Sequence, residues 1–106
     1  MSLCVLCFHR VADSFDPIGL SVCAESFKQL VLALSTTNRI VPLKDSLNYI
    51  ENKETYYCIT FDDGYCDLQD FAIPYLASIN VPASIFIPTY YTVKQIPFWW
   101  EVAAYI

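Results

Sequence analysis

The sequence predicts an α/β fold in which parallel strands are joined by crossover helices. Apolar runs that suit strands occur at residues 3–8, 56–61 and 82–89, and stretches with helical periodicity separate them. No hairpin signal joins any two of these runs, which favours right-handed βαβ connections and a parallel sheet or barrel. The 106 residues, of which 56% are hydrophobic, suit one domain spanning residues 1–106.

The N-terminal part is expected to begin with a strand and to continue into a helix. The run "LCVLCF" at residues 3–8 is continuous, as in a strand that is buried on both faces. A loop with Pro17 and Gly19 follows. Residues 24–36 then carry apolar side chains at i, i+3, i+4 and i+7 from Phe27, which predicts an amphipathic helix.

The rest of the chain repeats this order. Residues 39–43 suit a short strand and residues 44–52 a modest helix, before the strong strand at 56–61. Residues 67–80 predict a helix, and residues 82–89 predict the third strand. Within that helix, Pro74 is expected to cause a bend and Asn80 to supply a left-handed cap.

Candidate catalytic residues follow the predicted strands. In parallel α/β folds, the chemistry gathers at the carboxyl ends of the strands. His9 follows the first strand, Asp62 and Asp63 end the second and Thr89 ends the third, so they are expected on one rim. A histidine after a strand is commonly a loop residue and an Asp before a helix is commonly its N-cap. One cap needs only one Asp, however, and Gly64 indicates a turn where the backbone approaches something closely.

Composition excludes several classes of protein. The net charge is −5 with only six Lys and Arg, so no basic patch exists for nucleic acid. No apolar run approaches the roughly 18 residues of a membrane span, and the N-terminus does not resemble a secretory signal. The C-x-x-C at Cys4 and Cys7 points to opposite faces of a strand. We expect the five cysteines to be buried free thiols in a cytoplasmic protein.

The acidic pair lies in a segment that resembles a known family. The stretch "ITFDDGY" resembles the first motif of polysaccharide deacetylases, carbohydrate esterase family four, which include the nodulation-type chitooligosaccharide deacetylases. The stretch "CFHRV" resembles the opening of their poly-N-acetylglucosamine deacetylase branch. "ESFKQLVLAL", "IPYLASINVPASIFIPT" and "PFWWEVAAYI" are similar to later family segments. The resemblance implies the N-terminal half of a distorted (β/α) barrel.

The resemblance also implies a reaction, the hydrolysis of N-acetyl groups on an amino-sugar polymer or oligosaccharide. By this resemblance Asp62 is the general base that acts on the attacking water, and Asp63 binds a divalent metal. Zinc is the favoured metal, with cobalt and nickel as alternatives. His9 matches a histidine that protonates the leaving amine, a role that suits imidazole because it exchanges protons near neutral pH.

One family feature is missing, which leaves the function open. The family's second motif, H-x-x-x-H, supplies two further metal ligands, whereas His9 is the only histidine here. We therefore expect an incomplete domain, an N-terminal portion or a truncated product, that is inactive alone and self-associates through an open sheet edge. The alternative is a non-catalytic interaction module derived from a deacetylase. A phosphotransfer or receiver module is disfavoured, because no further Asp ends the first or third strand.

Overall fold

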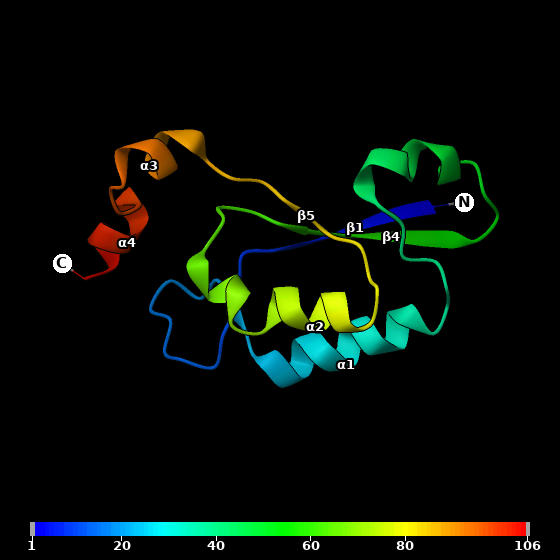
Figure 1. The fold of residues 1–106 in the computed structure, drawn as a ribbon, viewed down its shortest axis with the longest axis horizontal. Coiled ribbons are helices and arrows are strands. Elements are labelled where there is room, and N and C mark those ends of the chain that lie inside the picture. The colour runs from blue at the N-terminus through cyan, green and yellow to red at the C-terminus, as the bar shows by residue number, and fades with distance from the viewer. Residues whose placement is uncertain (1, 106) are drawn as a thin grey trace.

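The computed structural model describes residues 2–105. Its strands are β1 (Ser2–Phe8), β2 (Arg10–Val11), β3 (Ser21–Val22), β4 (Thr55–Phe61) and β5 (Ser84–Ile85). Its α-helices are α1 (Ala24–Ser35), α2 (Ala72–Ser78), α3 (Thr89–Lys94) and α4 (Trp99–Ala104). Two 3-10 helices, η1 (Leu43–Tyr49) and η2 (Cys66–Gln69), complete the order shown in Figure 1.

The main sheet is parallel, as the sequence predicted. Its strand order is β1-β4-β5, so β4 lies at the centre and the other two strands lie on either side. The register pairs Phe8 with Phe61 and Phe61 with Ile85, which levels the carboxyl ends of all three strands. A second, two-stranded parallel sheet of β2 and β3 was not predicted, because two residues are too few to show a period.

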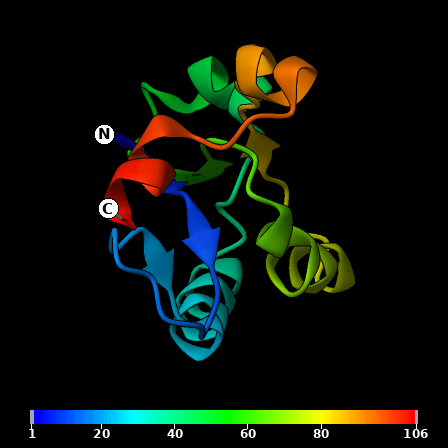
Figure 2. The ribbon, with the colours of Figure 1, turned by 90° about the vertical axis from the view of Figure 1, so that its left-hand side faces the viewer.

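The hydrophobic core lies between the main sheet and two helices. Helices α1 and α2 run side by side on one face of the sheet, and η1 lies against β4 on the other (Figures 1 and 2). The buried residues of this core are Val11, Phe27, Val31, Ile59, Phe61, Leu68, Ala72 and Leu76. Phe27 meets Phe8 edge to face at 5.2 Å between ring centroids, which ties α1 to β1.

Strand β1 is less buried than its apolar sequence predicted. Its side chains are intermediate or exposed, and Val5 is 48% exposed. The expectation that the strand is buried on both faces is therefore wrong for this chain. The physical reason is its position, since β1 pairs with β4 on one side only and the face that carries Val5 and Cys7 is not covered.

The cysteines are free but mostly not buried. Only Cys58, on the central strand, is buried, whereas Cys7, Cys23 and Cys66 are exposed and Cys4 is intermediate. Cys23 has a local task, because its sulfur accepts a hydrogen bond from the Ser26 backbone N–H as the N-cap of α1. The expectation of buried thiols thus holds for one residue of five, because Cys7 lies on the uncovered face, Cys23 and Cys66 lie at helix starts, and Cys4 lies on the edge strand β1.

Several predicted elements are shorter than expected. Of residues 39–43, only Ile40 pairs with β4, and Pro42 has no N–H to continue the pairing. Residues 44–52 mostly fall in the 3-10 helix η1 rather than in an α-helix. The third strand, expected over residues 82–89, is reduced to β5.

The helix predicted over residues 67–80 is two helices. The first piece is η2, and α2 begins only at Ala72. Pro74 therefore lies in the first turn of α2, where a missing N–H costs nothing, so it starts a helix instead of bending one. Asn80 has φ of 55°, which confirms the left-handed cap.

The chain ends in a segment that leaves the core. Residues 86–105, here called the C-terminal arm, contain α3 and α4, and neither helix has a buried residue. Figure 1 shows the arm at one end of a molecule with principal extents of 49 × 28 × 22 Å. Within residues 2–105, no helix is both long and apolar enough to span a bilayer.

Candidate active site

The register of β1 against β4 brings the histidine and the acidic pair together. Because Phe8 pairs with Phe61, the next residues on the two strands, His9 and Asp62, leave the sheet at the same level. The backbone N–H of Asp62 donates to the Phe8 carbonyl at 2.9 Å, which extends the ladder by one more bond. The Nε2 atom of His9 then lies 4.0 Å from Oδ2 of Asp63.

A tight turn begins at the second of the two carboxylates. Asp63 has φ of 70° and Gly64 has φ of 61°, so two successive residues adopt left-handed backbone. Asp tolerates this region better than most residues, yet it is uncommon for a residue with a side chain. A Cβ on Gly64 would lie 3.3 Å from Cγ1 of Ile87. The close approach that the glycine predicted is therefore made by the segment after β5.

Asp62 faces a cavity and accepts a hydrogen bond from a thiol. The Cys7 Sγ donates to Oδ2 of Asp62 at 3.4 Å. Burial, and then this hydrogen bond, raise the pKa of the Cys7 thiol, so it stays a protonated donor at neutral pH. The cavity measures about 260 Å³ and is lined by Asp62, Asp63, Phe86, Ile87 and Pro88. One carboxylate oxygen is thus oriented by β1 beside an open space.

A second hollow lies on the other side of Asp63. It measures about 290 Å³ and is lined by His9, Ile18, Leu20, Asp63, Trp99 and Trp100. The side chains of His9 and Asp63 are 35% and 23% exposed, so a ligand can reach both. Asp63 lines both spaces, and the pair of hollows forms one candidate site at the carboxyl ends of the strands.

Arg10 is held by partners beside the site. Its Nε donates to Oδ2 of Asp67 at 2.7 Å, and its guanidinium carbon lies 4.9 Å from the ring centroid of Tyr65. Burial lowers the pKa of Arg10, but the Asp67 carboxylate outweighs that and the net direction is upward. Because its charge is balanced by Asp67, Arg10 adds little positive potential to the site.

Tyr65 connects the acidic turn to the C-terminal arm. Its hydroxyl donates to Oε1 of Glu101 at 2.7 Å and accepts from the Trp100 indole N–H at 2.9 Å. Burial, together with the Glu101 hydrogen bond, raises the pKa of Tyr65 to about 12. Sequence reasoning missed this network and the Cys7 contact, because each joins side chains at least 35 positions apart. Only knowledge of the parallel register of β1 and β4 could have suggested that Cys7 lies beside Asp62.

Thr89 does not belong to the site. It was expected to end the third strand on the same rim, but β5 ends at Ile85 and Thr89 begins α3 four residues later. The residues level with the acidic pair are instead Phe86 and Ile87, and the Phe86 N–H donates to the Phe61 carbonyl at 2.8 Å. The early end of pairing moves Thr89 away from the cavity that contains Asp62.

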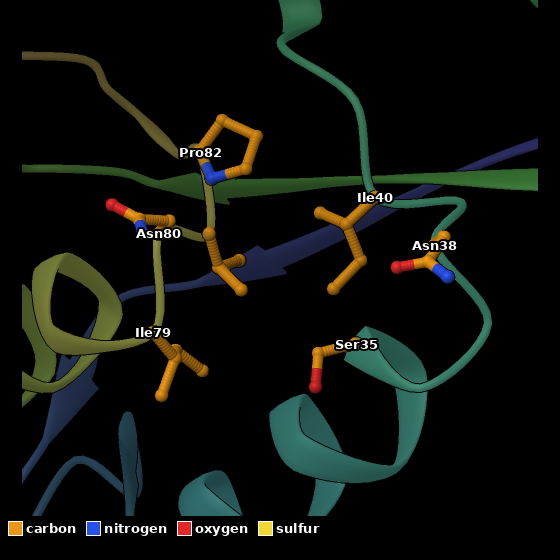
Figure 3. Close-up of a pocket in the computed structure, with 7 residues that line it drawn as sticks. Ser35, Asn38, Ile40, Ile79, Asn80 and Pro82 are labelled. Atoms are coloured by element: carbon orange, nitrogen blue, oxygen red, sulfur yellow. The ribbon is translucent and has the colours of Figure 1, made fainter.

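A further cavity, of about 200 Å³, lies toward the amino ends of β4 and β5. Figure 3 shows Ser35, Asn38 and Ile40 on one side of it and Ile79, Asn80 and Pro82 on the other. No titratable side chain lines this cavity. His9, Asp62 and Asp63 lie at the opposite, carboxyl end of the sheet.

The described residues include too few possible ligands for a complete metal site. A carboxylate and an imidazole are zinc-type ligands, and those of Asp63 and His9 converge. Within residues 2–105, however, no three His, Cys, Asp or Glu side chains are grouped so that they could hold a metal ion. A catalytic zinc site commonly takes three protein ligands, so these residues do not complete one.

Comparison with known proteins relates this geometry to solved folds. No family model matches the chain, and no curated protein matches it in sequence. The structure of IcaB from Ammonifex degensii matches with a TM-score of 0.69 and 28% identity, over 80% of this chain and 37% of that one. A de-N-acetylase from Aggregatibacter actinomycetemcomitans matches with a TM-score of 0.60 and 21% identity, over 78% and 36%. The chain thus spans little more than a third of either protein.

Proposed function

Because the chain has a polysaccharide deacetylase-like fold over part of its length, we propose that it supplies the proton-transfer residues of a de-N-acetylase active site. One observation carries the proposal. His9 and Asp63 face each other at 4.0 Å, with Asp62 beside them, at the carboxyl ends of parallel strands. In parallel α/β barrels the catalytic groups commonly lie at that rim, and the de-N-acetylase neighbour supports the type of reaction.

Each residue has a distinct role in the proposal. Asp62 takes the proton of the attacking water, and the Cys7 thiol orients its carboxylate. His9 delivers a proton to the amine that leaves. Asp63 is one ligand of a divalent metal, with zinc favoured and cobalt or nickel as alternatives. When bound, such a metal supplies an activated water and polarises the acetyl carbonyl.

The substrate class follows from the reaction and the charge. An N-acetylated amino-sugar polymer or oligosaccharide carries the amide that these groups cleave, and it has no negative charge to be repelled. The chain has a net charge of −5, and the acidic pair faces the cavity. A polyanionic ligand such as nucleic acid is disfavoured on the same ground.

The proposal requires metal ligands from outside residues 1–106, because it assigns only Asp63 to the metal and keeps His9 for proton transfer, and no group of three possible ligands occurs within residues 2–105. Residues 1–106 alone are accordingly expected to be inactive. A second candidate function is a non-catalytic interaction module. One observation that favours it is the edge strand β1, which pairs with β4 on one side only. Another is the apolar surface of the arm, where Val93, Trp99 and Tyr105 are 78%, 67% and 76% exposed.

Sequencing the DNA beyond the codon for Ile106, followed by an acetate-release assay of the gene's full product, separates the two candidates. The enzyme proposal expects a downstream H-x-x-x-H and metal-dependent acetate release from N-acetylglucosamine oligomers. Replacing His9 by Ala should then lower turnover by about a hundredfold. A stop codon directly after Ile106, with no acetate release under zinc, cobalt or nickel, would favour the interaction module.

A further inference from the structure

The hollow between the acidic turn and the C-terminal arm combines reactive and apolar walls. His9 and Asp63 form one side, and Trp99 with Trp100 forms the other. The hollow shares Asp63 with the cavity that contains Asp62, so the two spaces are neighbours. The roles proposed above involve His9 and Asp63 but neither of the two tryptophans.

Trp100 is held in place by two contacts and in turn packs against Trp99. Its indole N–H donates to the Tyr65 hydroxyl at 2.9 Å. One ring face stacks on Phe98, with 4.6 Å between centroids and 7° between planes. Trp99 stands nearly perpendicular to Trp100, at 85° and 5.7 Å, and is 67% exposed. The exposed indole is therefore held at its edge by an anchored ring.

The apolar floor of the hollow is also fixed in place. Ile18 and Leu20 belong to a loop that is organised around the carboxylate of Asp16. That carboxylate accepts hydrogen bonds from the backbone N–H groups of Ile18, Gly19 and Leu20 and from the Ser21 hydroxyl, at 2.8 to 3.2 Å. A preorganised surface loses less conformational entropy when it binds a ligand.

We propose that Trp99, with Ile18 and Leu20, forms a stacking subsite for a pyranose ring adjacent to the ring whose acetamide reaches Asp62 and His9. This inference rests on the proposed function and extends it to how the polymer is held. A pyranose ring presents faces rich in C–H groups, which bury apolar surface against an indole. Its hydroxyl edge stays in water at the open side of the hollow.

The charges around the hollow limit which sugars can bind there. Asp63 lines the hollow, Glu101 follows the lining residue Trp100 in the chain, and the positive charge of Arg10 is already paired with Asp67. A neutral N-acetylglucosamine unit is accepted there, and a deacetylated, cationic unit is favoured by the carboxylates and by the indole face. A glycan with uronic acids is repelled. The subsite therefore suits partly deacetylated amino-sugar polymers.

Calorimetric titration of residues 1–106 with the tetramer of N-acetylglucosamine tests the subsite without any catalysis. We expect saturable binding that weakens about tenfold or more in Trp99→Ala, which corresponds to about 1.4 kcal/mol. The matched control is Tyr105→Ala, since Tyr105 is an aromatic residue of the arm that is at least as exposed as Trp99 and does not line the hollow. A partly deacetylated tetramer should bind more tightly than the fully acetylated one, and an oligogalacturonate should bind least.

Circular dichroism verifies that each variant is folded before titration. Equal affinity of the wild type and Trp99→Ala, or no binding by the folded wild type, would overturn the subsite. The subsite and the proposed function can fail separately. Sugar binding through Trp99 without acetate release from the gene's full product would retain the subsite and reject the enzyme. Acetate release with an unchanged KM in Trp99→Ala would do the reverse.

Discussion

The helix-covered half of the molecule and the C-terminal arm reach the same site by different means. The first holds every buried residue of the core, between Val11 and Leu76, and places His9, Asp62 and Asp63 through backbone pairing of β1 with β4. The arm has no buried residue in its helices; beyond the backbone hydrogen bond of Phe86 to Phe61, it is attached chiefly through the side chains of Tyr65 and Trp100. Reactive groups are thus set by the fold, and the proposed sugar-binding groups by a few contacts.

The largest loss of stability is expected from a substitution in the core of the helix-covered half. Phe27 is fully buried and contacts the rings of Phe8 and Phe61, so Phe27→Ala should leave a cavity under the site-bearing strands. We expect a loss of about 3–5 kcal/mol of unfolding free energy in a urea titration. The control Phe15→Ala removes a ring that is 87% exposed and should change stability by less than about 0.5 kcal/mol. Similar losses in both variants would contradict the assignment of the core.

The second-largest loss of stability is expected at the turn of Asp63 and Gly64, where the core approaches Ile87 of the arm. Gly64→Ala adds a Cβ at 3.3 Å from Ile87 and forces φ of 61° on a residue with a side chain. Gly19→Ala is a matched control, because Gly19 also has positive φ but meets nothing within 4 Å. Both variants should lose about 1–2 kcal/mol from the backbone. Gly64→Ala should lose more, and urea titration that ranks Gly19→Ala equal or worse would refute the close approach.

A smaller change should loosen the arm and leave the core intact. Tyr65→Phe removes the hydroxyl that joins Glu101 and Trp100, at a cost of about 1 kcal/mol for such hydrogen bonds. Proteolysis within residues 86–105 should accelerate, while the urea midpoint of the core changes little. Tyr90→Phe serves as the control, since Tyr90 is 62% exposed. Unchanged proteolysis in Tyr65→Phe would show that the arm is held by other contacts.

The smallest effect is a dependence on alkaline pH. The folded pKa of Tyr65 is raised to about 12, above its ordinary value of 10.0, because the neutral hydroxyl is the form that the folded state stabilises. Its contribution is therefore complete below pH 10 and is lost as the pH rises toward 12. Tyrosinate absorbance of the wild type should show a step near pH 12 that is absent from Tyr65→Phe. Identical absorbance curves for the two proteins in that range would contradict this prediction.

The sequence was sufficient for the parts that depend on period and chain order. Continuous apolar runs at β1 and β4 predicted a parallel sheet, and the rule for its carboxyl end predicted that His9 and Asp63 meet. Asn80 was identified as a left-handed cap because Asn tolerates that backbone. These inferences succeeded because they concern local backbone preference and its direct consequence in a parallel sheet.

The remainder depends on tertiary contacts that no local pattern reveals. Pro74 was read as a bend because the pattern did not show that α2 begins only two residues before it. Thr89 was placed on the rim because an apolar run does not reveal where pairing with β4 stops. Neither the Cys7 thiol beside Asp62 nor the Tyr65 and Trp100 pair could be predicted, since each needs the register or the fold of the arm.

The central claim is that two adjacent carboxylates, Asp62 directly after β4 and Asp63 in the turn that follows, perform different tasks. The most direct measurement is the metal content of the gene's full product in its Asp62→Asn and Asp63→Asn forms, by elemental analysis after dialysis against zinc. The account predicts that Asp63→Asn loses the metal, because Asp63 is the proposed ligand, whereas Asp62→Asn keeps the metal and loses turnover, because Asp62 is the proposed base. Equal loss of metal from both forms would contradict it.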